Sequence, residues 1–301
     1  MRALRSWMFV PGHSDKMIAK SMGFDVDVVM LDLEDGVVPE LKAQSQSKVA
    51  AGLSAPRQVL GPLRYVRVNG AETSLLPGDL DAVAIAGIDG IVLPKVESIA
   101  QVQEVSAMLE RLERERGLAN GAIRLMLAIE TARAVIAAPA LAAGSARVSG
   151  LMFGAEDFSR DIGLPTVRSG RAREFIHARS AIIMACHAAG VLPIDNVWPD
   201  LEDSEGLRQD TILGRDLGFT GKSLIHPSQV ATINGVYQPS EHDLAFARSL
   251  IDEFDIAFRE GRGSIAFGGQ LVDRPIYERA RATIARAARG GCSDTGEEAR
   301  A

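Results

Sequence analysis

The most constraining feature of this 301-residue sequence is an apolar segment that recurs along the chain and stops each time at charged residues. In residues 125–129 no charge interrupts the apolar run, and Glu130 follows it directly. A segment that is apolar on both alternating faces is typical of a strand buried in a parallel sheet. Because functional side chains gather at the carboxyl ends of parallel strands, Glu130 is predicted to lie at a site.

Seven further strands are predicted, and most are separated by segments with helical character. The eight predicted strands lie near residues 7, 28, 65, 91, 126, 151, 192 and 222. Eight βα units within about 230 residues predict a TIM (β/α)8 barrel rather than a doubly wound sheet, because both the size and the regular alternation match.

The predicted barrel occupies residues 1–238, with Pro239 as its boundary. Residues 239–289 are predicted to form a C-terminal helical extension, in which a glycine-rich connector over residues 261–269 joins two helices. The final residues, 290–301, are small and polar, which predicts a disordered tail.

Composition narrows the classes of function. A net charge of -6 and a pI near 5.5 argue against a nucleic-acid-binding protein. The two cysteines, Cys186 and Cys292, lack the spacing of a zinc site or a disulfide framework. No signal peptide and no apolar run of about 18 residues is recognised, so we expect a cytoplasmic protein without a membrane partner.

Charged or polar side chains follow most of the predicted strands and should share one mouth of the barrel. They are Asp32, Glu34, Asp35, Arg67, Lys95, Glu97, Glu130 and Asp157. Two carboxylates from neighbouring strands suit Mg²⁺, or Mn²⁺ in its place, and we assign this role to Glu130 and Asp157. Any one of these acids could instead cap a helix or form a loop ion pair.

Arg67 presents a planar, permanently charged set of donors, which suits the stabilisation of an oxyanion or the binding of a carboxylate. It could also pair with Asp32 or Glu34, and the two roles are compatible. No nucleophile elbow, P-loop or GxGxxG after a strand is present, so acyl-enzyme, NTPase and dinucleotide functions have no motif support.

An ordered set of short motifs resembles the citrate lyase beta-subunit and acyl-CoA ester lyase family of the HpcH/HpaI aldolase superfamily. The motifs span nearly the whole chain, and the set is specific although each motif alone is weak. They are residues 5–12 (RSWMFVPG), 29–37 (VMLDLEDGV), 66–69 (VRVN), 93–97 (LPKVE), 129–132 (IETA), 153–157 (FGAED), Asp195, 218–222 (GFTGK), 225–227 (IHP) and 269–275 (GQLVDRP).

The resemblance implies a Mg²⁺-dependent retro-Claisen or retro-aldol cleavage of a 3-hydroxyacyl thioester to an acetyl thioester and a 2-oxo acid. By the family's pattern, Glu130 and Asp157 hold Mg²⁺, which chelates the 2-oxo acid, and Arg67 faces the same substrate oxygen. In such lyases an aspartate of the C-terminal segment, often reaching from a neighbouring subunit, transfers the proton to the thioester carbon. Asp273 matches that position.

The remaining matched positions receive supporting roles from the resemblance. Glu34 and Asp35 are expected to assist catalysis by ordering metal-bound water and Arg67. Lys95 is expected to help them and to contribute to substrate binding, while Arg5 and Lys16 are expected to meet CoA phosphates near the barrel mouth.

Two departures from the family pattern bear on these roles. Gly269–Gln270 stands where relatives often have Asp-Gly, which affects the placement of Asp273. Glu156 lies beside Asp157 and is a possible competing metal ligand.

The favoured hypothesis is a free-standing CoA-ester lyase of the malyl-CoA or citramalyl-CoA type, because the extension carries Asp273. The resemblance also implies a homo-oligomer, a trimer or hexamer. Four alternatives stay open: the beta subunit of a multi-subunit citrate lyase that uses a carrier-protein thioester, an aldolase for a free hydroxy-oxo acid, a related acyl-CoA thioesterase, and a non-catalytic assembly subunit.

Overall fold

The computed structural model describes residues 3–165 and 172–290 of the chain. These residues divide into two compact units: residues 4–234 form one, and residues from 235 onward belong to the other. Pro239, the predicted boundary, lies in the short connection between helices α9 (Val230–Tyr237) and α10 (Glu241–Arg259). Cys292 and the predicted tail beyond Gly290 lie outside the described residues.

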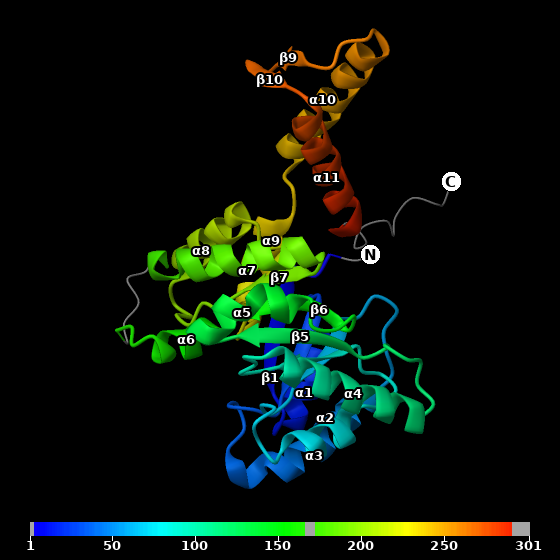
Figure 1. Cartoon of the computed structure of the whole chain (residues 1–301), viewed down its shortest axis with the longest axis vertical. Helices are drawn as coiled ribbons and strands as arrows, with labels where there is room; N and C mark the ends of the chain where they lie inside the picture. Colours follow the sequence, from blue (N-terminus) through cyan, green and yellow to red (C-terminus); the bar gives the residue numbers. More distant parts are fainter. Residues whose placement is uncertain (1–2, 166–171, 291–301) are drawn as a thin grey trace, which may run out of the picture. The chain divides into compact units, whose positions relative to one another are not determined.

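The first unit is a closed barrel of eight parallel strands in sequential order, surrounded by helices (Figure 1). The strands are β1 (Ser6–Pro11), β2 (Val28–Asp32), β3 (Leu63–Arg67), β4 (Gly90–Leu93), β5 (Arg124–Ile129), β6 (Val148–Phe153), β7 (Leu192–Asp195) and β8 (Gly221–Leu224). This architecture confirms the predicted TIM barrel, since a strand lies at each of the eight expected positions.

Helices connect the strands, as the alternation predicted. They are α1 (Asp15–Ser21), α2 (Lys42–Ser54), α3 (Leu76–Val83), α4 (Ile99–Glu115), α5 (Ala132–Ala142), α6 (Ala155–Asp161), α7 (Ile176–Ala189) and α8 (Ser204–Leu217). Short polar side chains define where several begin: Ser98 and Gln101 form a capping box at α4, and the Thr131 hydroxyl accepts from the N–H of Ala134 at α5.

The barrel interior is packed with apolar side chains contributed by successive strands. Trp7 and Tyr65 meet edge to face at a centroid distance of 4.9 Å, within a cluster that includes Met126 and Met152. In the strand register, Pro11 lies beside Asp32 and Asp32 lies beside Arg67. The packed interior therefore supports a rigid upper edge on which charged residues of neighbouring strands are adjacent.

The second unit has its own small core. Helix α10 and helix α11 (Arg274–Gly290) pack together with Leu250, Phe254 and Val272 among the buried side chains. The predicted glycine-rich connector is partly wrong, because Ile265–Phe267 forms strand β9 and pairs antiparallel with β10 (Gln270–Val272). Gly268 and Gly269 both have positive φ, which lets the chain reverse within this hairpin.

Among the described residues, no helix combines the length and the apolar character needed to cross a membrane.

Candidate active site

A cavity of about 320 Å³ opens at the carboxyl ends of the barrel strands. Its lining is acidic and apolar, and the strand-end groups Asp32, Arg67, Glu130 and Asp157 all contribute to it. Phe9, Val92, Ala128 and Met152 supply part of its apolar wall, each from a different strand. The structure therefore brings together the four residues that the sequence placed at the carboxyl ends of β2, β3, β5 and β6.

Arg67, the last residue of β3, is held by two carboxylates at the carboxyl end of the neighbouring strand β2. Its Nε and Nη2 atoms donate to the two carboxylate oxygens of Asp32 at 2.8 and 2.7 Å. Its Nη1 lies 3.1 Å from Oε2 of Glu34. Burial alone would lower the pKa of Arg67, but these acids raise it above its usual range, so the guanidinium stays charged at every ordinary pH.

Asp32 fixes the loop that follows β2 as well as Arg67. Its carboxylate accepts hydrogen bonds at 2.9 Å from the backbone N–H groups of Glu34 and Gly36. Although burial would raise its pKa, the neighbouring Arg67 lowers it below the ordinary value. A buried carboxylate with this many donors is a positioning element for Arg67 and for the 34–36 loop.

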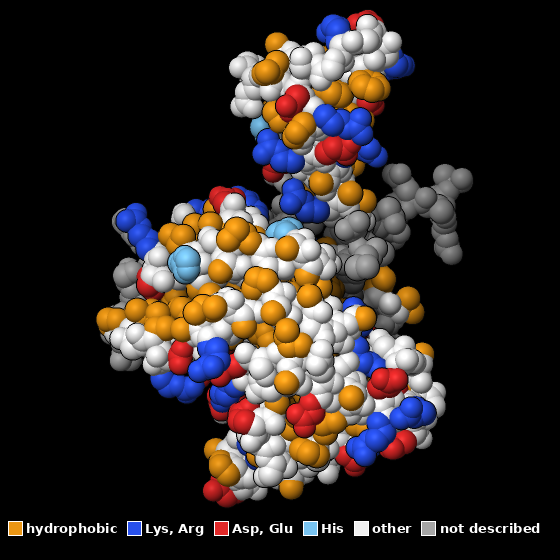
Figure 2. All heavy atoms as spheres, viewed as in Figure 1, with side chains coloured by type: hydrophobic (Ala, Val, Ile, Leu, Met, Phe, Trp, Pro, Cys, Tyr) orange, Lys and Arg blue, Asp and Glu red, His pale blue; other side chains and the backbone are white. Residues whose placement is uncertain are grey.

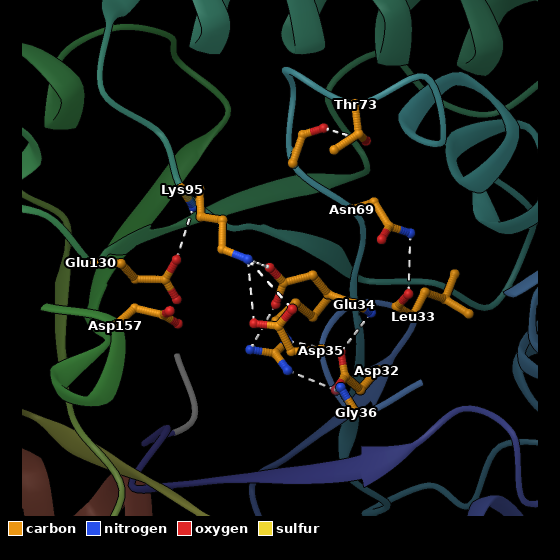
Figure 3. Close-up of polar contacts among 12 residues, drawn as sticks. Asp32, Leu33, Glu34, Asp35, Gly36, Asn69, Thr73, Lys95, Glu130 and Asp157 are labelled. Atoms are coloured by element: carbon orange, nitrogen blue, oxygen red, sulfur yellow. Dashed lines mark hydrogen bonds and ion pairs between the residues drawn. The ribbon is translucent and has the colours of Figure 1, made fainter. Parts of the chain in front are cut away.

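Lys95 connects Glu130 to the acids that follow β2, because its backbone contacts the first and its side chain contacts the others. The N–H of Lys95 donates to Oε2 of Glu130 at 2.9 Å, and its ammonium contacts Glu34 and lies 3.3 Å from Asp35 (Figure 3). The residue has a φ of 52°, in the left-handed region that non-glycine residues rarely adopt. Such a backbone conformation is characteristic of positions that a functional site constrains.

Glu130 is a buried carboxyl whose pKa is shifted upward, opposite to that of Asp32. It is 4% exposed. Burial, together with the negative charges of Glu34 and Asp157, raises its pKa to about 7, although the nearby Arg67 acts in the opposite direction. Glu130 and Asp157 lie next to each other in Figure 3, and both line the cavity. A strongly shifted acid in a cleft is a candidate functional group.

Asp157 lies in the first turn of α6, close behind β6, and its Oδ1 is 2.6 Å from the guanidinium of the exposed Arg160. The approach of Glu130 depends on Gly154, because a Cβ at that position would come within 2.4 Å of Cγ of Glu130. Glu156, the possible competing ligand, is exposed and also lines the cavity. Within the FGAED segment, Gly154 therefore leaves the space that Glu130 needs beside Asp157.

The donor set at Glu130 and Asp157 suits a hard cation bound partly by water and substrate. Within the described residues, no group of three or more His, Cys, Asp or Glu side chains has a metal-binding arrangement. Structural zinc requires such a set, whereas Mg²⁺ is commonly held by one or two carboxylates and completes its shell with other oxygens. The raised pKa of Glu130 fits this, since a cation beside it would offset the repulsion from Asp157 and Glu34.

The prediction that Arg5 lies near the barrel mouth is wrong. Arg5 precedes β1, where its backbone N–H and its Nε donate to Oδ2 of Asp27 at 2.7 and 3.0 Å. Asp27 in turn precedes β2, so both residues lie at the amino ends of the strands. Six strand residues separate Arg5 from the carboxyl end of β1, which is roughly 20 Å at about 3.3 Å per residue.

Lys16 and Asp273 occupy exposed positions. Lys16 is in the first turn of α1, which follows the carboxyl end of β1. Asp273 lies in the second unit, between β10 and α11, and its carbonyl accepts from the N–H of Tyr277. The roles predicted for both residues therefore stay predictions.

Two features of the site escaped the sequence analysis. The Phe9 ring lies 4.8 Å from the guanidinium carbon of Arg67, a cation–π contact. Its inward position could have been found from the alternation along β1, in which Trp7 also faces the interior. The hydrogen bond from the Lys95 backbone to Glu130 had no signal in the sequence, because it depends on a backbone conformation rather than on a side chain.

Comparison with known proteins identifies relatives along almost the whole chain. Residues 5–227 match the family described as HpcH/HpaI aldolase/citrate lyase. Citrate lyase subunit beta of Leuconostoc mesenteroides subsp. cremoris is 38% identical over 93% of this chain and 92% of its own length. L-malyl-CoA/beta-methylmalyl-CoA lyase of Cereibacter sphaeroides is 33% identical over 95% of each chain.

A solved structure agrees with these relatives in fold. The protein CitE from Mycobacterium tuberculosis, in complex with magnesium, acetoacetate and coenzyme A, superposes with a TM-score of 0.79 at 32% identity. The match covers 95% of this chain and 98% of that one. The resemblance inferred from the sequence motifs is therefore confirmed at the level of the family.

Proposed function

This chain belongs to the HpcH/HpaI aldolase/citrate lyase family, and we propose on that premise that it cleaves a 3-hydroxyacyl-CoA to acetyl-CoA and a 2-oxo acid. Its reaction class is that of a carbon–carbon lyase. The observation that carries the proposal is the meeting of Glu130, Asp157 and Arg67 in one cavity.

Glu130 and Asp157 are the residues that would hold Mg²⁺, and magnesium is present in the CitE complex described above. Bound there, the ion would supply Lewis-acid polarisation of the carboxylate and adjacent oxygen of the 2-oxo acid portion. Mn²⁺ could replace it, since it accepts the same oxygen ligands.

Arg67 would stabilise the oxygen that becomes the 2-oxo group. Among the described residues that line the cavity, it is the only cation, and Asp32 and Glu34 hold its planar fork in place. A fixed donor of this kind stabilises developing negative charge without reorganising during the reaction. Glu34, Asp35 and Lys95 would support this geometry, because the Lys95 N–H donates to Glu130 and its ammonium contacts Glu34. The substrate-binding role of Lys95 stays a prediction.

The cleaved bond joins the hydroxyl-bearing carbon to the carbon next to the thioester. Its electron pair moves to the carbon next to the thioester, which gives the enolate of the acetyl thioester. The hydroxyl proton passes to solvent as the 2-oxo group forms, and the carbon next to the thioester gains a proton, so that no net proton is consumed. We assign that last transfer to Asp273, whose exposed carboxyl lies on the second unit. In related lyases the matching aspartate often reaches the site from a neighbouring subunit, as the motif resemblance implies.

Lys16 is the residue we assign to the CoA phosphates. It is exposed and follows the carboxyl end of β1, the end of the barrel at which the cavity opens. A flexible ammonium suits a phosphate as a point charge. Arg5 is withdrawn from this role because of its ion pair with Asp27.

An oligomer is supported by hydrophobic side chains on the outer face of the barrel. Figure 2 shows such side chains gathered over α5 and α7, where Ile136 is 83% and Met184 is 66% exposed. Apolar surface of this kind is typical of an interface between copies. Light scattering should give a mass above that of one 32.1 kDa chain, and an Ile136→Lys, Met184→Lys variant should shift the mass towards the monomer.

The beta subunit of a citrate lyase is the second candidate, and the 38% identity to the Leuconostoc protein favours it. The two candidates differ in the thioester: the first uses a free CoA ester, and the second a citryl group on a carrier protein. A barrel that takes only the carrier-bound ester would be inactive towards every CoA ester.

The decisive experiment is to incubate the purified protein with Mg²⁺ and malyl-CoA, citramalyl-CoA or citryl-CoA and to follow acetyl-CoA and the 2-oxo acid. Cleavage of one ester, lost on chelation and restored by Mg²⁺, is expected. Hydrolysis of the thioester without carbon–carbon cleavage would support the thioesterase instead. Inactivity towards all three esters would overturn the CoA-ester proposal.

The role of Asp273 has its own test. Asp273→Asn should lower turnover by about 10² to 10⁴, while binding of the 2-oxo acid with Mg²⁺ stays nearly unchanged. Asp255, a half-buried acid of the same unit that accepts from the hydroxyl of Tyr277, provides the control: Asp255→Asn should keep turnover. Loss of both binding and turnover in Asp273→Asn would mean that Asp273 has a structural role.

A further inference from the structure

The barrel contains a buried serine that neither the motifs nor the proposed mechanism uses. Ser223 lies on β8, is 1% exposed and lines the same cavity as Glu130, Asp157 and Arg67. Its hydroxyl has no hydrogen-bond partner among the described residues. Buried hydroxyls normally have partners, so this exception requires an explanation.

The strand register explains why Ser223 points inward. Along β8 the side chains alternate, and Lys222 faces outward, where its ammonium lies 2.6 Å from Asp210 of α8. Ser223 pairs in register with Trp7 of β1, which belongs to the interior cluster. Phe9, which is also on β1, lines the cavity together with Ser223. Ser223 is therefore a polar residue on an otherwise apolar stretch of the cavity wall.

We propose that Ser223 is a substrate-binding residue whose hydroxyl forms a hydrogen bond to an oxygen of the 2-oxo acid portion in the cavity. This rests on the proposed function for the chemical class of the ligand, a small 2-oxo acid. Such an acid is rich in acceptor oxygens, and a serine hydroxyl can donate to one of them. A buried polar group that has no partner within the protein favours a ligand that pairs with it.

The chain offers a matched control. Ser45 of α2 is also fully buried, and its hydroxyl also has no partner among the described residues, but it is not among the residues that line the cavity. Replacing either serine by alanine removes one oxygen and preserves the size of the side chain closely. The two variants therefore separate the loss of a buried hydroxyl from the loss of a ligand contact.

The experiment is isothermal titration, in the presence of Mg²⁺, of glyoxylate, pyruvate and oxaloacetate into the full chain. For the acid that binds the wild type most tightly, Ser223→Ala should raise Kd about tenfold, and Ser45→Ala should leave Kd unchanged. Neither variant should lower the thermal unfolding midpoint, because each removes an unpaired buried group.

Equal Kd values for the wild type and Ser223→Ala would overturn the proposal, as would failure of the wild type to bind any of the three acids. A lower unfolding midpoint together with weaker binding in Ser223→Ala would assign the serine a structural role and also overturn it. The outcome is distinguishable from that of the lyase assay: cleavage of a CoA ester with unchanged binding in Ser223→Ala would retain the function and reject this residue. Weaker 2-oxo acid binding in Ser223→Ala, without cleavage of any CoA ester by the wild type, would retain the binding role of this residue and reject the lyase function.

Discussion

Two groups of charges in the same barrel, one fully buried and one partly buried, differ in how their charges balance. The first, here called the balanced cluster, comprises Arg179 of α7, Asp195 of β7, Asp210 of α8 and Lys222 of β8, all with side chains at most 3% exposed. The second, the mouth cluster, comprises Asp32, Glu34, Arg67, Lys95, Glu130 and Asp157.

In the balanced cluster, two cations meet two carboxylates. Lys222 lies 2.6 Å and Arg179 lies 2.7 Å from the carboxylate of Asp210. Burial alone would raise the pKa of Asp210, but these cations lower it below the ordinary value. The cluster joins α7 and α8 to β7 and β8, and its effect is structural.

In the mouth cluster, four carboxylates face two cations. Asp32 and Glu34 contact Arg67 and Lys95, whereas Glu130 faces the negative charge of Asp157 and has a pKa near 7. Burial of charge alone therefore does not mark a functional site. An excess of one sign, left uncompensated beside a cavity, does mark one, because it stabilises the binding of an opposite charge.

Turnover should change more than any other property when the mouth cluster is altered. Glu130→Gln removes one of the two excess negative charges of the mouth cluster and should lower kcat/KM for the thioester on the order of 10⁴-fold, about 5 kcal/mol, since the proposed metal ligand is lost. Steady-state kinetics measures this, and denaturant unfolding should show no loss of stability. Activity within tenfold of the wild type would contradict the role of Glu130.

The balanced cluster should give the opposite pattern. Lys222→Met leaves Asp210 and Asp195 with one buried cation and should reduce the free energy of unfolding by about 3–5 kcal/mol. Replacing Asp210 as well, in Lys222→Met with Asp210→Leu, should restore part of that loss, because a matched pair is then removed. Urea denaturation measures both variants. If Lys222→Met were as stable as the wild type, the balanced cluster would add nothing to the free energy of unfolding.

The two clusters should also respond to pH with opposite signs in metal-free protein. Glu130 has an ordinary pKa of 4.5 and a native pKa of about 7, so the native state binds the extra proton between these values. Its contribution is lost as pH rises through that window, by roughly 3 kcal/mol. Asp210 has a lowered pKa, so its contribution is present above its ordinary value of 3.8 and is lost as pH falls through the native value.

The measurement for this comparison is the free energy of unfolding against pH, in the presence of a chelator. The difference in the free energy of unfolding between wild type and Glu130→Gln should change between about pH 4.5 and 7. The difference between wild type and Asp210→Asn should be flat there and change only in the acid range. A flat Glu130 difference curve would show that its environment does not raise its pKa.

The smallest effect is that of added metal on stability. Mg²⁺ at a hundred times its Kd should raise the free energy of unfolding of the wild type by about 2.7 kcal/mol. Glu130→Gln should show little of this gain, whereas a variant of an unrelated exposed acid such as Glu205→Gln should keep all of it. Equal gains in all three proteins would place the metal elsewhere.

Much of this arrangement was predictable from residues close together in the chain. Apolar runs that end on charged residues predicted the eight strands and placed Arg67, Glu130 and Asp157 at one mouth. The prediction for Arg5 failed because the motif that contains it spans the full length of β1, and its two ends lie on opposite sides of the barrel. The hairpin of β9 and β10 was missed because its strands are only three residues long.

The barrel and the chemical groups at its strand ends could be predicted from the order of residues, because strand periodicity and the direction of a parallel sheet are local properties. Which charges are paired and which are left in excess became evident only from the folded arrangement. Arg67 and Asp32 are 35 residues apart, and so are Lys95 and Glu130. Charge balance, pKa and the unpaired hydroxyl of Ser223 depend on burial and on distances between such residues, which the order of residues along the chain does not contain.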